Sequence, residues 1–180
     1  MASPPFAHPS VARLDGSVDR VAARLRGRAP VDRALYALSR AGDHSVLWHG
    51  INVVDAVIGG PGHRRRALRR SVVLVVEQTV VNGPVKSAFR RDRPDHVTDH
   101  PHPLRSPATS SFPSGHASAG ACATVLLSQD LGAAPLWAGL AAAVAWSRVH
   151  VGAHHASDVV GGAVVGAGLA AVASRIWPAP

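Results

Sequence analysis

The chain has 180 residues, a length typical of one domain, and a formal net charge of +8 at pH 7. Aromatic residues make up only 4% of it, which argues against the stacking platforms that bind single-stranded nucleic acids, so we expect no nucleic acid partner. The single cysteine, Cys122, excludes an internal disulfide.

The N-terminal region differs in composition from the rest of the chain. Residues 1–30 lack the apolar core of a secretory signal peptide, and their scattered Pro and Arg predict a flexible basic tail. Residues 31–41 follow with apolar side chains at helical spacing and Asp32, Arg33 and Arg40 on the other side. This helix would be about 16 Å long, too short to cross a bilayer, so we expect an interfacial amphipathic helix.

The remaining chain alternates apolar stretches with loops. We expect helices over 44–58, 64–85, 115–129, 135–149 and 158–177. Together they predict an all-α, membrane-embedded bundle of about five transmembrane helices plus the N-terminal amphipathic helix, with residues 31–178 as one domain. In this part, Asp55 should face protein or water. Glu77, Gln78 and Asn82 should face the interior of the bundle.

Two features of the apolar segments bear on packing and orientation. Gly162-x3-Gly166 permits close helix contact, within the chain or, as a less favoured alternative, between two copies. The basic cluster Arg64-Arg65-Arg66 directly precedes an apolar helix, which indicates a cytoplasmic membrane edge; a solvated basic turn is the alternative. We therefore expect a multi-pass protein of the cell membrane with its polar loops on the extracytoplasmic side.

Three short stretches gather residues that phosphoryl transfer requires. They are Lys86-x6-Arg93-Pro94, Pro113-Ser114-Gly115-His116, and Ser147-Arg148-x5-His154-x3-Asp158. The cations Lys86, Arg93 and Arg148 suit a phosphate dianion and its transition state. Ser114 is placed to cap a helix whose free N–H groups attract an anion, with Gly115 allowing close approach.

The two histidines have separate expected roles. His154 and Asp158 are neighbours if they share a helix, so the carboxylate can fix the ring tautomer and leave one nitrogen as a nucleophile. His116 would stand beside the bound anion and donate a proton to the leaving oxygen. A metal face formed by His150, His154 and Asp158 is the alternative, which Arg148 disfavours because it would repel a cation.

Other polar residues between the first two stretches have weaker signals. Arg90 and Arg91 would bind a second anionic group of the substrate or lipid headgroups. A set of potential metal ligands lies in a Pro-rich loop without regular spacing, which favours a flexible rim over a metal site: Asp95, His96, Asp99, His100 and His102.

The three stretches together, with eleven specified positions between residues 86 and 158, resemble the signature of the type-2 phosphatidic acid phosphatase superfamily. That family includes membrane lipid phosphatases and vanadium-dependent haloperoxidases. The resemblance implies that His154 attacks phosphorus to form a phosphohistidine, that Asp158 orients it, and that His116 protonates the leaving alkoxide and then activates water. It also implies that the phosphoryl oxygens are held by Lys86, Arg93, Ser114, Gly115 and Arg148. The family works without a metal, so the resemblance implies no metal and no cofactor.

The resemblance implies a metal-independent lipid phosphatase in the membrane, whose partner is its lipid phosphate substrate; it says nothing of the oligomeric state. Integral members usually have six membrane helices, whereas here the first is reduced to residues 31–41. The small size and the Arg, Ala and Val bias resemble short actinobacterial members, which favours decaprenylphosphoryl-5-phosphoribose, an arabinan precursor of the cell wall, as substrate. Polyprenyl diphosphates, phosphatidic acid and phosphatidylglycerophosphate are alternatives, as are a haloperoxidase and a non-catalytic lipid-phosphate binder.

Overall fold

The computed structural model describes residues 4–94 and 109–179, and these residues form helices and connecting loops without a strand. The elements are η1 (Pro4–Ala7), α1 (Pro9–Ala23), α2 (Ala29–Ala41), η2 (Asp43–Ser45), α3 (Val46–Ile58), α4 (Pro61–Val80), η3 (Val81–Val85), α5 (Gly115–Leu131), α6 (Ala134–His150) and α7 (Ala156–Ile176). The all-α prediction is therefore confirmed for this part of the chain.

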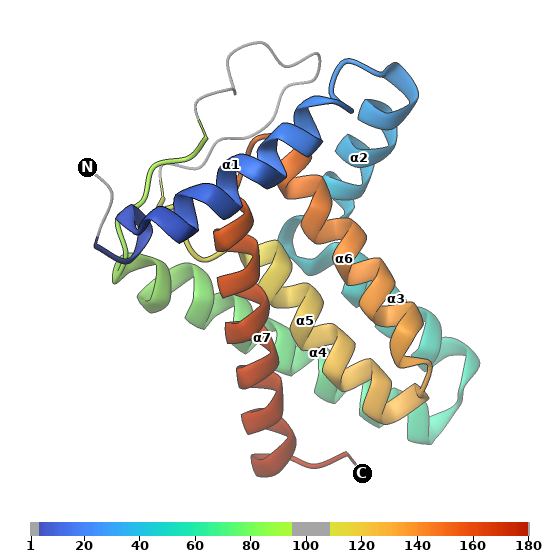
Figure 1. The fold of residues 1–180 in the computed structure, drawn as a ribbon. Helices are drawn as coiled ribbons and strands as arrows, with labels where there is room; N and C mark the ends of the chain where they lie inside the picture. The colour runs from blue at the N-terminus through green and yellow to red at the C-terminus, as the bar shows by residue number, and fades with distance from the viewer. Residues whose placement is uncertain (1–3, 95–108, 180) are drawn as a thin grey trace.

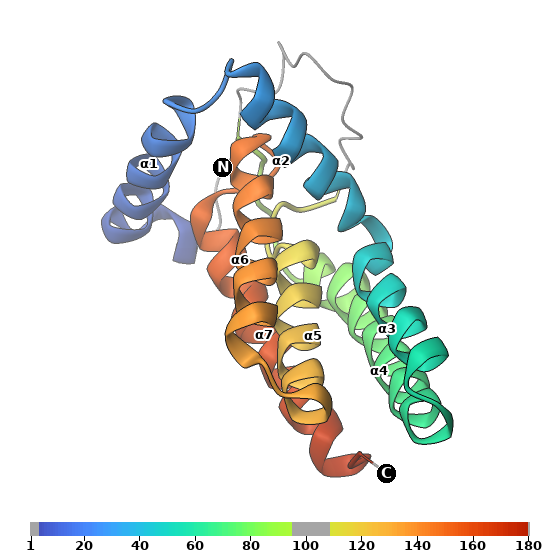
Figure 2. The ribbon, with the colours of Figure 1, turned by 90° about the vertical axis from the view of Figure 1, so that its right-hand side faces the viewer.

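Helix α5 lies at the centre of the bundle and packs against α4, α6 and α7 (Figure 1). Helices α3 and α4 form an antiparallel pair on one side, as Figure 2 shows, and α2 packs on α6. The core joins Trp48 of α3 and Leu74 of α4 to Leu126 of α5 and Val144 of α6, all at most 1% exposed. This packing places the start of α5, the end of α6 and the start of α7 at one end of the molecule.

The outward surface of the bundle is rich in apolar side chains, as expected of helices that face lipid. Val57, Ile58, Val164 and Ile176 are each more than two-thirds exposed. Among the described residues, one helix, α7, is both long and apolar enough to cross a membrane by itself. Helices α5 and α6 have 17 residues each, about 26 Å, and α4 carries five Arg, so the number of spans stays a prediction.

The N-terminal region differs from the sequence prediction. Residues 9–23, expected within a flexible tail, form α1, which lies across the ends of α6 and α7 (Figure 1). Arg26 secures the turn after it by donating to the carbonyl oxygens of Val149 and His150 at 2.9 and 2.8 Å. Val11, Leu14, Val18 and Val21 recur at helical spacing, a signal that the interpretation of residues 1–30 from their Pro and Arg content did not use.

The expected face of α2 was also wrong. Asp32, predicted on the exposed side, is buried together with Tyr36 and Ser39. The reason is a distant partner, because His150 at the end of α6 lies 2.8 Å from the Asp32 carboxylate. A buried carboxylate is stable only with such a partner, and short-range periodicity carries no information about it.

The prediction of where the polar side chains lie holds for Asp55, Glu77 and Gln78, and it is wrong for Asn82, which was expected in the bundle interior. Asp55 is 10% exposed on its side chain and pairs with Arg70 and with His63, the latter at 2.7 Å. Glu77 is buried and accepts a hydrogen bond from Ser118, and Gln78 donates to the Gly115 carbonyl at 3.1 Å. Asn82 is exposed, although its amide donates to Gln78.

The helix predicted over 64–85 begins earlier and changes type before its end. It starts at Pro61, and residues Val81–Val85 form a π-helical turn that contains Pro84. Proline lacks the N–H that the α-helical ladder needs and clashes with the carbonyl four residues earlier, which accounts for the change. Helix α7 likewise starts at Ala156 and not at residue 158, with His155 as its N-cap.

Helices α5 and α7 approach so closely that their backbones touch. A Cβ atom added to Gly162 would run into the carbonyl of Ser114, and one added to Gly166 would run into the carbonyl of Ser118. The prediction that Gly162 and Gly166 serve contact within the chain is confirmed.

We expect Gly166→Ala to destabilise the protein by about 1–3 kcal/mol, because the added methyl must push α7 away from the α5 backbone. Thermal unfolding in detergent micelles measures the effect. Gly168→Ala is the matched control, since a Cβ there meets nothing within 4 Å and the helix gains from the loss of a glycine. Equal melting temperatures for the two variants would contradict the close packing.

Candidate active site

The three signature stretches meet at the end of the bundle covered by α1. The Ser114 N–H, just before α5, donates to the backbone carbonyl of Asp158 in α7 at 3.0 Å. The N–H groups of Ala153 and His154 donate to the carbonyl of Arg148 at 3.0 and 3.2 Å. Arg93 reaches the same turn, because its Nη1 donates to the Ala153 carbonyl at 2.8 Å. Residues far apart in sequence therefore surround one small volume.

His154 and Asp158 are close, but not in the way that the sequence predicted. His154 precedes α7, so the two do not share a helix, and His154 Nδ1 lies 3.7 Å from Asp158 Oδ2. Oδ2 accepts instead from the backbone N–H of His155 at 2.9 Å, closing a capping box at the start of α7. The carboxylate therefore stands within reach of the His154 ring while its own position is set by the helix end.

His154 is held as a neutral imidazole. Its side chain is 3% exposed, and its Nδ1 is a buried atom without a hydrogen-bond partner. Burial, helped by the charges of Arg148 and Arg93, lowers the pKa of His154 to about 3. A neutral ring retains a lone pair on one nitrogen at physiological pH, which is the state required of a nucleophile.

Arg93 and Arg148 lie close enough to His154 to act on its charge, and Lys86 lies close to both of them. The Arg148 guanidinium donates to the Ser39 hydroxyl of α2, and Lys86 follows the π-helical turn at the end of α4. The Nε atoms of Arg93 and Arg148 are buried without a hydrogen-bond partner. Because buried donors are normally paired, these unused N–H groups indicate a place for an anion.

The mutual repulsion of the cations is visible at Lys86. Burial, reinforced by Arg93 and Arg148, lowers the pKa of Lys86 from 10.5 to about 8. An entering phosphate would relieve both the repulsion and the missing hydrogen bonds.

The Pro-Ser-Gly-His stretch builds the start of α5 as expected. The Ser114 hydroxyl accepts from the Ala117 N–H at 3.5 Å and caps the helix. Asn82 closes the space beside Gly115, since an added Cβ would lie 2.9 Å from its side-chain oxygen. The backbone at this turn is therefore packed closely on both sides.

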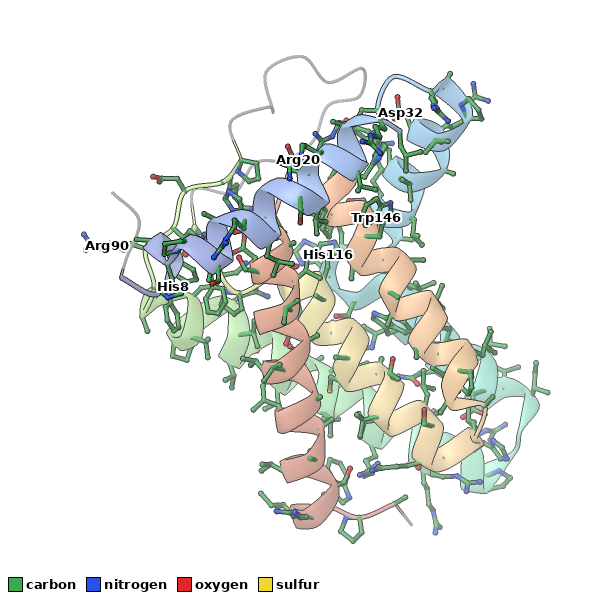
Figure 3. The ribbon with its side chains drawn as sticks, viewed as in Figure 1. His8, Arg20, Asp32, Arg90, His116 and Trp146 are labelled. Carbon is green, nitrogen blue, oxygen red and sulfur yellow. The ribbon has the colours of Figure 1, made fainter. Side chains whose placement is uncertain are left out.

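His116 lies at the end of α5 that faces α1 and α2 (Figure 3). Its Nε2 is 3.1 Å both from the carbonyl oxygen of Ser39 and from the carboxylate of Asp43. The hydrogen bond with His116 lowers the pKa of Asp43. The sequence analysis did not identify Asp43 as a site residue.

The alternative metal face is not formed. Helix α6 ends at His150, which turns away to pair with Asp32, so His150 and His154 do not share a face with Asp158. No group of three or more potential metal-ligating side chains occurs in residues 4–94 and 109–179. The predicted flexible rim with Asp95, His96, Asp99, His100 and His102 lies outside the described residues.

A cavity of about 240 Å³ opens beside His154. Its walls include Arg93 and His155 and, from α1, Asp15 and Gly16. Helix α1, which the sequence prediction placed in a tail, thus borders the same volume as the signature residues.

The family of the chain follows from comparison with known proteins. The model of the PAP2 superfamily matches residues 67–179. The chain belongs to the PAP2 superfamily. Two curated relatives are named decaprenylphosphoryl-5-phosphoribose phosphatase: that of Mycolicibacterium smegmatis is 37% identical over 150 residues (82% of this chain, 80% of the relative), and that of Mycobacterium tuberculosis H37Rv is 32% identical over 139 residues (77% and 76%).

Solved structures share the fold. The PAP2-type phosphatidylglycerolphosphate phosphatase of Bacillus subtilis superposes with a TM-score of 0.73 at 22% identity, covering 96% of this chain and 88% of that one. LpxE of Aquifex aeolicus gives 0.70 at 19% identity, covering 88% and 93%. The family match and the named relatives make the protein a PAP2-type phosphatase, a phosphoric monoester hydrolase, and the two structures show that it has the helical fold of membrane PAP2 phosphatases.

We expect the kcat/KM for phosphomonoester hydrolysis to fall above about pH 8, where Lys86 in the free enzyme loses the proton that makes it a phosphate ligand. Lys86→Arg should move this alkaline limb upward by at least about one pH unit, because a guanidinium stays charged. A limb that stays at the same pH in the variant would assign it to another group.

Proposed function

We propose that the protein removes the 5-phosphate of decaprenylphosphoryl-5-phosphoribose through a phosphohistidine intermediate. The observation that carries this proposal is the match to two relatives of that name over about four-fifths of the chain. The chemistry of the site supports it, since the neutral His154 lies near Arg93 and Arg148, each of which has a buried Nε–H group without a partner.

The proposed reaction begins with attack of His154 on phosphorus. The phosphoryl oxygens lie among Lys86, Arg93 and Arg148, with Ser114 and Gly115 at the start of α5 as further ligands. The charge of these cations stabilises the transition state in a site from which water is largely excluded. Asp158 stabilises the positive charge that develops on the attacking ring.

His116 completes the cycle in this proposal. As an imidazolium it donates a proton to the departing sugar oxygen, and as a neutral base it then takes a proton from the water that cleaves the phosphohistidine. The Asp43 carboxylate lies 3.1 Å from its Nε2 and can accept a hydrogen bond from the ring in either charge state.

We further propose that the site faces the extracytoplasmic side of the membrane. The site lies beyond the end of α4, next to Lys86, whereas Arg64, Arg65 and Arg66 lie in the first turns of the same helix. Basic residues at a helix end favour the cytoplasm, so the opposite end of α4 faces outward.

Purified protein in detergent should release phosphate from decaprenylphosphoryl-5-phosphoribose in the presence of EDTA, because no step requires a metal. The measurement is phosphate release across a panel that also holds a polyprenyl diphosphate, phosphatidic acid and phosphatidylglycerophosphate. A kcat/KM that is higher for a panel lipid without the sugar would overturn the substrate assignment while leaving the phosphatase reaction intact.

The two histidines should respond differently to the leaving group. We expect His154→Ala to lower kcat by at least about 10⁴-fold on every substrate, since no other group replaces the nucleophile. His116→Ala should lower kcat/KM, which does not include the later hydrolysis of the phosphohistidine, by about 10²–10⁴-fold on the lipid substrate but far less on p-nitrophenyl phosphate, whose leaving group departs without a proton. Equal losses of kcat/KM on both substrates would exclude His116 as the general acid.

A further inference from the structure

Arg91 lies between Lys86 and Arg93 in the sequence but is not part of the signature. In the structure it contacts Asp158 at the active site. Its Nη1 donates to the carboxylate of Asp158 and, at 2.7 Å, to the Ser157 hydroxyl. Its Nη2 donates to Asp15 of α1 at 2.6 Å. The side chain is 7% exposed, so the prediction that Arg91 binds a second anionic group or lipid headgroups was wrong.

Asp15 in turn ties α1 to the first turn of α7. Its carboxylate accepts from the Ser157 N–H at 2.8 Å and from the Ser157 hydroxyl at 2.9 Å, in addition to Arg91. The N–H groups in the first turn of a helix have no partner within the helix, so an outside carboxylate stabilises them. Helix α1 thus holds both the guanidinium and the helix end that carries Asp158.

An aromatic cluster fixes the same guanidinium from another side. The Phe6 ring, ahead of α1, stacks on Arg91 with 4.4 Å between the guanidinium carbon and the ring centroid. Phe6 also packs on Phe112, and Phe112 on Phe89, each pair with centroids 4.8 Å apart. The Phe6 ring therefore packs on the face of the guanidinium, and the carboxylates of Asp15 and Asp158 accept hydrogen bonds from its N–H groups.

These contacts decide the orientation of the Asp158 carboxylate. Arg91 takes Oδ1, and the His155 N–H takes Oδ2. With both oxygens held and the side chain fully buried, the carboxylate cannot rotate about its Cβ–Cγ bond without breaking a hydrogen bond. Its distance from His154 Nδ1, 3.7 Å, is consequently set by Arg91 as much as by α7 itself.

We propose that Arg91 is a positioning residue that holds Asp158 against the His154 ring, and that α1, through Asp15, is a required part of the catalytic apparatus. The proposal rests on the proposed function in that it takes His154 as the nucleophile. In this arrangement Asp158 favours the tautomer with hydrogen on Nδ1, which leaves Nε2 free for attack.

The test compares Arg91→Met, Arg91→Lys and Asp15→Asn with the wild-type full-length protein in detergent. Arg20→Met, on the exposed side of α1, is the control for loss of a positive charge near the site (Figure 3). We expect Arg91→Met to lower kcat by about 100-fold, and Asp15→Asn and Arg91→Lys by about 10-fold, while Arg20→Met stays within about twofold of wild type. KM and inhibition by inorganic vanadate should change little in all four, because the phosphate ligands remain.

Two readouts separate positioning from a merely structural role. The double variant Asp15→Asn/Arg91→Met should lose far less activity than the product of the two single losses, since Asp15 acts on Asp158 largely through Arg91. The ¹⁵N shifts of the His154 ring should report hydrogen on Nδ1 in the wild type and in Arg20→Met, and a shift towards hydrogen on Nε2 in Arg91→Met and Asp15→Asn.

The ring shifts do not depend on turnover, so the two proposals can fail separately. If the wild type lacks phosphatase activity, the proposed function is overturned. If the tautomer of His154 still differs between the wild type and Arg91→Met as expected, the role of Arg91 is supported. An unchanged tautomer in Arg91→Met would overturn that role, whatever the loss of activity. Multiplicative losses in the double variant, with a raised KM and a lowered melting temperature, would likewise reduce Arg91 to a structural residue.

Discussion

The contact between the backbones of α5 and α7 is the constraint on which the site depends. Gly162 and Gly166 let α7 lie directly on the carbonyls of Ser114 and Ser118, and at the upper end of this contact the Ser114 N–H meets the carbonyl of Asp158. That hydrogen bond joins the second signature stretch to the third. Side chains larger than hydrogen at these glycines would separate the start of α5 from the start of α7, and with them the phosphate ligands from the proposed nucleophile.

The buried cations of the active site differ from Arg70 in that they lack carboxylate partners for some of their N–H groups. Away from the site, Arg70 is paired with Asp55 and Asp130, whereas the buried Arg69 donates only to the Trp177 carbonyl and the Ser174 hydroxyl. At the site, Arg93 and Arg148 keep buried N–H groups without partners, and Lys86 has a depressed pKa. Unpaired buried cations cost free energy, so their presence at one place indicates that an anion completes the structure there.

The N-terminal helix extends the site beyond the signature. Helix α1 borders the cavity beside His154, and its Asp15 shares one guanidinium with Asp158. Asp43, after α2, lies 3.1 Å from His116 Nε2. Each proposed catalytic histidine therefore has a carboxylate nearby, and two segments from the first quarter of the chain contribute to the arrangement.

The sequence by itself determined the helical class, most helix positions, the eight proposed site residues and the family, because periodicity and short motifs are local properties of the chain. It did not predict α1, the buried face of α2, or the partners Asp15, Asp43 and Arg91. The buried face of α2 and these three partners depend on contacts between residues far apart, such as Asp15 with Ser157 at a separation of 142 residues, which only the packing of α1 on α7 brings together. The tertiary structure also decided that His154 precedes α7, because the capping box places the start of that helix at Ala156.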